Sequence, residues 1–105
     1  MNRSLRIQPL AEEDIQQGHD WYEEKRVGLG DELLANFQNC FDRIRANPLR
    51  FPVISRDVRR ALVRRFPYCV YFIVTGDTVA VLAVLHAKRN AETWENRIRS
   101  TRRPR

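Results

Sequence analysis

The side chains best suited to chemistry in this sequence are basic and lie in two short segments. They are Arg59, Arg60, Arg64 and Arg65 in the first segment and His86, Lys88 and Arg89 in the second. A guanidinium group binds a phosphate or a carboxylate through two parallel hydrogen bonds, and a neutral imidazole can act as a general base or bond to RNA. The pattern predicts a basic face for phosphates or for an acidic protein partner. Two structural interpretations stay open, because charge also protects an edge strand from aggregation and a histidine can simply cap a strand end.

Other catalytic patterns are absent from the sequence. It contains no glycine-rich phosphate loop, no histidine pair at metal-binding spacing and no serine nucleophile motif. Cys40 and Cys69 lie in apolar segments, which predicts buried thiols in a reducing compartment. His19 lies among polar residues and is predicted to be a surface side chain. We therefore expect neither a metal ion nor a cofactor.

The positive charge of the chain belongs to its second half. The chain has 19 Lys and Arg against 13 Asp and Glu, which gives a net charge of +6. Residues 1–50 carry a net charge of −2, whereas residues 51–105 carry +8. An arginine-rich surface favours a polyanion or an acidic protein as partner.

Length and composition predict one globular domain in the cytoplasm. The chain has 105 residues, and a domain commonly holds about 100–200. Its 43% hydrophobic and 30% charged residues exclude a wholly disordered chain. The longest apolar run, Val79–Leu85, is much shorter than the ~20 residues of a membrane-spanning helix. Acidic residues at positions 12–14 argue against a signal peptide, so we expect a cytoplasmic protein with no membrane partner.

The first half of the chain predicts a strand followed by two helices. Polar and apolar residues alternate over 3–8, as in a short strand. Apolar residues then recur every three or four positions over about 10–26 and again from Leu29 to Ile44, which is typical of amphipathic helices. Glycines at the junction and Asn47-Pro48 at the end bound the second helix, so the two helices form an antiparallel hairpin.

The second half predicts a loop over 48–56 and then three consecutive antiparallel strands. Their expected bounds are 56–66, Tyr68–Thr75 and Thr78–Ala87. In the first of these strands, Val58, Leu62 and Phe66 are expected to share one face. A short helix over 91–99 would be anchored on the sheet by Trp94, and residues 100–105 would form a basic disordered tail.

This order of elements predicts a two-layer α+β domain over residues 1–99. The order is β-α-α-β-β-β, with a possible short C-terminal helix. An antiparallel sheet packs against the N-terminal helix hairpin, and the first strand can join that sheet.

Seven short stretches of the sequence, taken with this order, resemble the ParE/RelE superfamily of bacterial toxins, whose ParE-like branch includes plasmid stabilisation proteins. They are Ala11–Ile15; Trp21–Glu23 with Gly28–Gly30; Ile44–Pro48 with Phe51-Pro52; Arg59–Tyr68; and Ala83–Arg89. The resemblance covers roughly residues 4–98. It implies the toxin of a type II toxin–antitoxin module, which inhibits growth until an acidic antitoxin folds on its surface. The residues expected to bind a partner are Arg59, Arg60, Arg64, Arg65, His86, Lys88, Arg89 and Trp94.

The superfamily contains two activities, and the resemblance distinguishes them by specific positions. RelE-like members cut messenger RNA on the ribosome with a set of basic side chains, whereas ParE-like members act on DNA gyrase and lack that set. Arg60 and Arg89 match basic positions of the set, but Leu62 and Cys69 stand where it has Lys and Arg. No tyrosine lies near the C-terminus, and each lost electrostatic contact can lower a rate by roughly 10²–10³. We therefore expect gyrase inhibition by protein–protein contact through residues 86–99, with a ribosome-dependent endoribonuclease using Arg60, His86 and Arg89 as the alternative.

Overall fold

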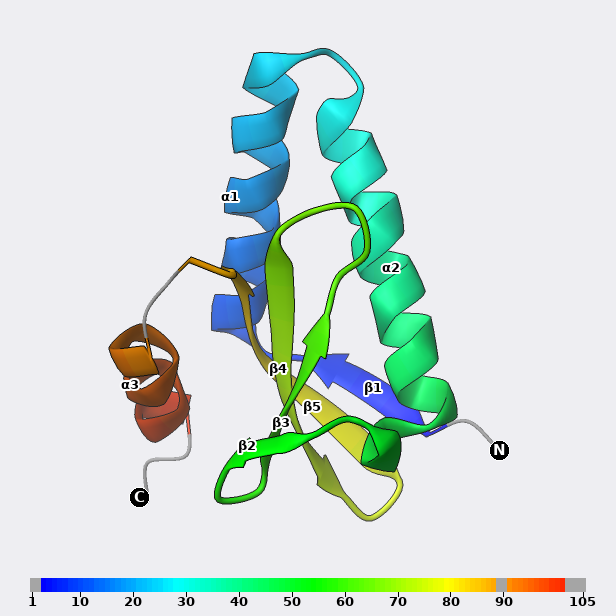
Figure 1. Cartoon of the computed structure of the whole chain (residues 1–105), viewed down its shortest axis with the longest axis vertical. Helices are drawn as coiled ribbons and strands as arrows, with labels where there is room; N and C mark the ends of the chain where they lie inside the picture. The colour runs from blue at the N-terminus through cyan, green and yellow to red at the C-terminus, as the bar shows by residue number, and fades with distance from the viewer. Residues whose placement is uncertain (1–2, 89–90, 102–105) are drawn as a thin grey trace.

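The computed structural model describes residues 3–88 and 91–101 and has the predicted α+β order (Figure 1). The elements are β1 (Ser4–Ile7), α1 (Pro9–Lys25), α2 (Leu29–Ala46), a 3₁₀ turn η1 (Pro48–Arg50), β2 (Val53–Ser55), β3 (Val58–Leu62), β4 (Tyr68–Thr75), β5 (Thr78–His86) and α3 (Ala91–Thr101). The segment expected to be a loop therefore contains η1 and the short strand β2. The last helix runs two residues beyond its predicted end and takes in the start of the expected tail, whose other residues, 102–105, lie outside the described part.

The sheet is mixed rather than antiparallel throughout. Its strand order is β1-β5-β4-β3-β2, and β1 pairs in parallel with β5 while the other pairs are antiparallel. Parallel neighbours need a long crossover connection, which α1, α2 and three strands supply here. The parallel pairing covers only Ser4–Ile7 against Thr78–Val81, so β5 continues well beyond the end of β1.

The two faces of the sheet are covered by different helices. Tyr68, Val70 and Phe72 of β4 face the α1–α2 hairpin, where they pack with the buried side chains of α2. Cys69 and Tyr71 face the opposite side. There the Trp94 ring of α3 stacks on the Tyr71 ring, with centroids 5.6 Å apart. The predicted role of Trp94 as the anchor of the last helix is confirmed.

Both cysteines are buried, as predicted, but on opposite faces of the sheet. Burial raises the pKa of the Cys40 thiol to about 11, and burial likewise raises the pKa of Cys69. The thiolate forms that react and bind metals are therefore disfavoured at both positions.

One predicted strand is shorter than expected. The basic segment is predicted to continue to Phe66. This is wrong, because β3 ends at Leu62, although Val58 and Leu62 share a face as predicted. Arg65 adopts a left-handed φ of 70° and redirects the chain. Phe66 then packs with the helix-facing core, while Val58 packs on the opposite face and Leu62 is 64% exposed.

The junction of α1 and α2 is held by a side chain of α1. The Glu23 carboxylate accepts hydrogen bonds from the backbone N–H groups of Gly28 and Gly30, at 2.9 and 3.0 Å. These bonds, led by that from Gly28, lower the pKa of Glu23. Gly28 has a φ of +91°, and its N-capping position at α2 has no side-chain cap of its own, so Glu23 caps the helix instead.

Replacing Gly30 with alanine should destabilise the protein. Helix propensity alone would make Ala better than Gly by about 1 kcal/mol. A Cβ at Gly30, however, would lie 2.6 Å from the backbone carbonyl oxygen of His19. We expect the cost of overpacking to exceed the gain in helix propensity, so that the free energy of unfolding falls by about 1–3 kcal/mol. Urea denaturation measures this change. Gly28→Asn is the matched control, because Asn tolerates the left-handed region; a more stable Gly30→Ala protein would contradict this account.

The hairpin junction should also respond to pH through His19. Its Nδ1 lies 3.0 Å from the Asp20 carboxylate and its Nε2 lies 3.4 Å from that of Asp31. The hydrogen bond with Asp20 is the largest of the causes that raise the pKa of His19. The protonated ring therefore stabilises the fold below the unfolded pKa of about 6.5, and this contribution is lost as pH rises through the folded pKa.

His19→Gln should therefore cost more stability at about pH 5.5 than at about pH 8. Urea denaturation of the variant and the parent chain at both pH values measures the difference. Asp20, whose pKa is lowered, stays ionised over this range. An equal loss at both pH values would rule out the contribution of the charged imidazole.

Candidate functional site

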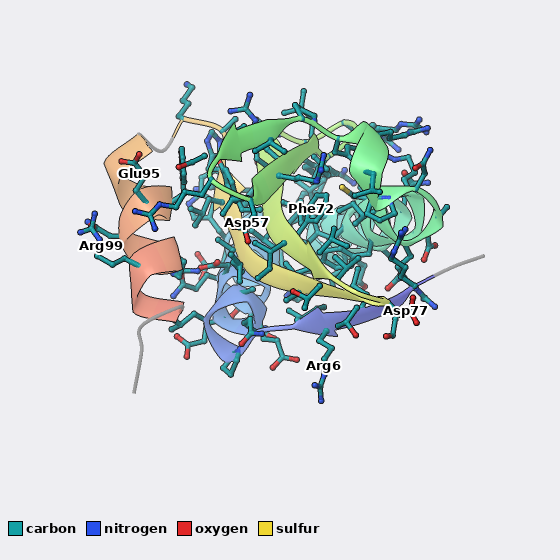
Figure 2. All side chains as sticks on the ribbon, turned by 90° about the horizontal axis from the view of Figure 1, so that it is seen from below. Arg6, Asp57, Phe72, Asp77, Glu95 and Arg99 are labelled. Atoms are coloured by element: carbon teal, nitrogen blue, oxygen red, sulfur yellow. The ribbon has the colours of Figure 1, made fainter. Side chains whose placement is uncertain are left out.

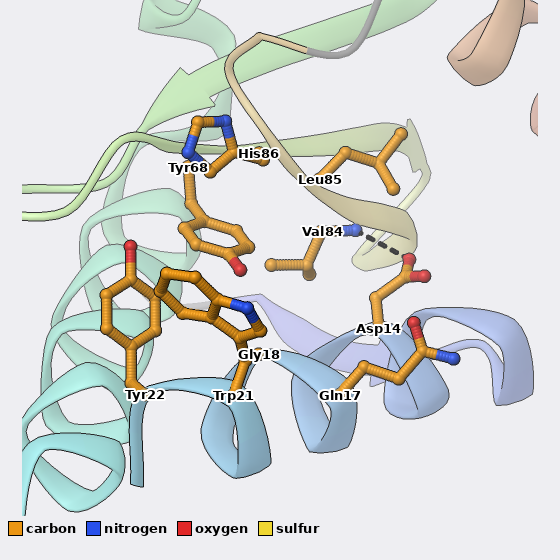
Figure 3. A pocket seen from close by; sticks show the side chains of 9 residues that line it. All are labelled: Asp14, Gln17, Gly18, Trp21, Tyr22, Tyr68, Val84, Leu85 and His86. Atoms are coloured by element: carbon orange, nitrogen blue, oxygen red, sulfur yellow. Dashed lines mark hydrogen bonds between the residues drawn. The ribbon is translucent and has the colours of Figure 1, made fainter. Parts of the chain in front are cut away.

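A pocket lies between α1 and the end of β5, where β5 extends past β1 (Figure 3). Its volume is about 300 Å³. The lining residues are Asp14, Gln17, Gly18, Trp21 and Tyr22 of α1, Tyr68 of β4, and Val84, Leu85 and His86 of β5. The pocket thus combines one carboxylate, one imidazole and three larger aromatic rings in a single concave site.

Asp14 closes one side of the pocket and connects three elements. It is the buried charged residue of the described core. Its Oδ2 accepts a hydrogen bond from the Val84 backbone N–H at 3.0 Å. The strand β1 ends before this point of β5 and so does not pair that N–H. The Arg97 guanidinium of α3 donates two more bonds to this carboxylate, at 2.6 and 3.0 Å. A buried charge needs both a counter-charge and hydrogen bonds, and Asp14 has both.

Sequence reasoning missed this role of Asp14. In the sequence, Asp14 is the last of three consecutive acidic residues, a run that favours the positive end of a helix dipole. A signal was present, because Asp14 falls three residues after Ala11 and four before Gly18, on the apolar stripe of that helix. Its partner Arg97 lies 83 residues away, and no local pattern connects the two.

The aromatic wall of the pocket is a continuous series of ring contacts. Tyr22 lies edge-on to Trp21 at 4.8 Å and tilted to Tyr68 at 6.3 Å, and Tyr68 lies edge-on to His86 at 5.5 Å. Gly18 allows the approach, since a Cβ there would lie 3.2 Å from the Tyr68 hydroxyl. Trp21 is 54% exposed, with the Lys25 ammonium 4.5 Å from its ring centroid. The aromatic wall is therefore half-buried at Tyr68 and open to solvent at Trp21.

The tautomer of His86 follows from one backbone bond. The Lys88 N–H donates to Nδ1 of His86 at 3.1 Å, so Nδ1 must be an acceptor and the neutral ring carries its proton on Nε2. This bond closes the turn after β5, which agrees with the interpretation that His86 caps the end of the strand. His86 also lines the pocket, and in this tautomer its second ring nitrogen is a donor.

The residues nominated for RNA cleavage do not converge. Arg60 pairs across the sheet with Tyr71, on the face covered by α3. His86 pairs with Tyr68, on the face of the α1–α2 hairpin. Side chains of a strand alternate between faces, so the sheet separates Arg60 from His86. Arg89 lies outside the described residues.

The other predicted partner contacts are dispersed over the surface. Arg59 donates to the backbone carbonyls of Leu49 and Phe51, at 3.2 and 2.7 Å, and so holds the η1 loop in place. Arg65 lies 3.9 Å from Glu32 of α2. Arg64 and Lys88 are exposed, whereas Trp94 is partly buried against Tyr71. Of the described basic residues, Arg59 and Arg65 thus contact different parts of the molecule, the η1 loop and α2.

The described residues offer neither a metal-binding cluster nor a membrane-spanning helix. Over 3–88 and 91–101, no group of three or more His, Cys, Asp or Glu side chains could hold a metal ion. Of the helices described, none combines the length and apolar character needed to cross a membrane.

A family model and a curated relative each match most of this chain. A family model described as the ParE toxin of type II toxin–antitoxin system, parDE, matches residues 5–91. Toxin ParE2 of Mycobacterium tuberculosis (strain CDC 1551 / Oshkosh) is 27% identical over 99 residues, covering 93% of this chain and 94% of the relative.

Two solved structures share the fold. One is a chromosomal ParDE system from P. aeruginosa, with a TM-score of 0.74, 17% identity and coverage of 82% of this chain and 97% of that one. The other is a mutant of the E. coli toxin RelE in the free state, with a TM-score of 0.70, 14% identity and coverage of 95% and 98%. At these identities the likeness establishes the fold alone.

Arg97→Ala should destabilise the protein far more than Arg99→Ala. The first change leaves the buried Asp14 carboxylate without its cation, which costs about 3 kcal/mol for a buried pair. Arg99 is an exposed neighbour on α3 and should change the free energy of unfolding by less than about 0.5 kcal/mol. Urea denaturation measures both, and hydrogen exchange at the Val84 amide reports whether Asp14 still holds it. Equal losses for the two variants would show that the ion pair contributes little.

Proposed function

We propose that this chain, which belongs to the ParE toxin family of type II toxin–antitoxin systems, inhibits DNA gyrase through protein–protein contact and is neutralised by a cognate antitoxin. One observation favours gyrase rather than messenger RNA as the target. Arg60 and His86, the two described members of the candidate RNase set, lie on opposite faces of the sheet.

Two further positions of that set support the same choice. At the position where the RNase set has a second Lys, this chain has the exposed Leu62. At the position where the set has an Arg, it has Cys69, a buried thiol whose pKa is raised. Phosphoryl-transfer chemistry depends on preorganised charge around the reacting phosphate. A face holding an exposed leucine and a buried neutral thiol at these positions lacks that charge.

The antitoxin partner follows from the family, and the charge of the chain suits it. The second half carries a net charge of +8, and the arginines of its described residues lie on several elements, among them β3 and α3. An acidic segment that folds along such a surface would gain from charge complementarity over a long contact.

We place the gyrase contact on the outer surface of α3 and the turn before it. Glu95, Asn96 and Arg99 of α3 and Lys88 of the turn are exposed. Trp94 and Arg97 hold the other side of α3 against Tyr71 and Asp14. The helix thus presents a polar, mixed-charge surface on a fixed base.

A second candidate function is a ribosome-dependent endoribonuclease. It is favoured by the basic Arg60 on the sheet face opposite the helix hairpin and by the shared fold with RelE. It would require Arg60 to act without His86, because the two side chains do not share a face.

The purified chain should inhibit supercoiling by gyrase and leave translation intact. Supercoiling and accumulation of cleaved DNA can be read on one gel, with a cell-free translation assay run beside it. Arg99→Glu should weaken gyrase inhibition about tenfold, as expected for reversing one interface charge. The matched control is Arg6→Glu, an equally exposed arginine on β1, away from α3 (Figure 2).

Blocked translation with unaffected gyrase would refute gyrase as the target and support the endoribonuclease. Equal effects of the two charge reversals would locate the gyrase contact elsewhere on the surface. Arg60→Ala separates the activities further, since it should abolish RNA cleavage but leave gyrase inhibition unchanged.

A further inference from the structure

We propose that the pocket between α1 and β5 binds a planar, uncharged heterocycle that carries hydrogen-bond acceptors, with a purine base as the ligand class. This goes beyond the gyrase hypothesis and does not depend on it. The base can belong to a free nucleotide or to a single strand of nucleic acid, which share this chemistry.

The shape of the pocket suits one ring system. Its volume of about 300 Å³ lies at the lower end of the roughly 300–1,000 Å³ typical of small-molecule sites. The rings of Trp21, Tyr22 and Tyr68 lie together on one side of it (Figure 3). Aromatic side chains bind bases by stacking, because every base has a π-face.

The polar groups at the pocket favour a ring with acceptor atoms. Three lining residues carry donors: His86 with Nε2–H, Trp21 with its indole N–H and Gln17 with its side-chain amide. Among the described residues, none of these three groups has a hydrogen-bond partner. A hydrocarbon ring from a phenylalanine or leucine side chain would remove these donors from water without pairing them, which is costly. The ring nitrogens of a purine can accept such bonds.

The charge at the pocket excludes a cationic ligand. Its one carboxylate, Asp14, is already paired with Arg97 through two bonds and with the Val84 N–H. An uncharged ring therefore meets no uncompensated charge. The exposed Lys88, two residues after His86 in the sequence, carries a positive charge that suits the phosphate of a nucleotide.

Nitrogen-15 NMR of the full chain tests this proposal directly. The chain has two tryptophans, Trp21 at the pocket and Trp94 on the opposite sheet face. The Trp21 indole N–H signal therefore reports on the pocket, and the Trp94 signal reports on the fold. The probes are adenosine 5′-monophosphate, single-stranded hexadeoxyadenylate and N-acetyl-phenylalaninamide. We expect the first two to shift the Trp21 indole signal saturably while the Trp94 signal stays in place.

Matched variants make the result specific. His86→Ala should weaken binding about tenfold through loss of one hydrogen bond, whereas His19→Ala, at the hairpin junction, should leave it unchanged. Gln17→Leu, on the exposed surface of α1, should weaken binding without disturbing the fold. This variant therefore tests the pocket even if the His86→Ala protein does not fold. An unchanged Trp94 signal verifies folding in each case.

Each outcome decides the proposal. Saturable shifts with adenosine monophosphate support it, and tighter binding of the oligonucleotide would identify a strand rather than a free nucleotide as the source. The absence of any Trp21 shift at millimolar probe in folded protein would overturn it. Binding of N-acetyl-phenylalaninamide alone would also overturn it and would assign the pocket to an aromatic side chain of a protein partner.

Discussion

The architecture of this protein depends on the environment of one buried carboxylate. β5 is longer than β1, so the Val84 N–H faces an open edge where no strand can pair it. Asp14 of α1 accepts that bond, but a buried carboxylate is unfavourable without a cation. Arg97 supplies the cation from the far end of the chain, and α3 must therefore lie beside α1. The position of the last helix thus follows from one backbone N–H of β5 that no neighbouring strand pairs.

The alternation of side chains along β4 organises the rest of the molecule. Tyr68 faces the helix hairpin and contributes to the aromatic wall, whereas Tyr71 faces the other side and supports Trp94. One strand therefore serves both the pocket and the docking of α3. The same alternation separates Arg60 from His86, because the residues they pair with on β4 point in opposite directions.

The basic side chains have more varied roles than their clustering in the sequence implies. Arg59 stabilises the η1 loop through two backbone carbonyls, and Arg97 neutralises Asp14. Arg65 redirects the chain with a left-handed backbone and lies near Glu32. A surface whose charges are partly committed to structure and otherwise dispersed favours an extended acidic partner over a single phosphate site.

Local patterns in the sequence determined most of the elements of this protein. The apolar stripe from Leu33 to Ile44 specified α2, and the glycines before it specified the hairpin. Trp94 was correctly predicted as the anchor of the last helix. These features depend on neighbouring residues, whose periodicity and allowed backbone angles are visible in one dimension. The family resemblance, too, rests on short local stretches.

Only the tertiary structure decided how these elements combine at the site. The parallel pairing of β1 with β5 leaves the Val84 N–H open, and that opening is what gives Asp14 its role. The turn at Arg65 moves Phe66 to the helix-facing core, and the pocket joins α1 to the end of β5. Pairings between residues 70 and 83 positions apart leave no periodic trace in the sequence. They arise because each unpaired polar group and buried charge must find a partner in the folded chain, wherever in the sequence that partner lies.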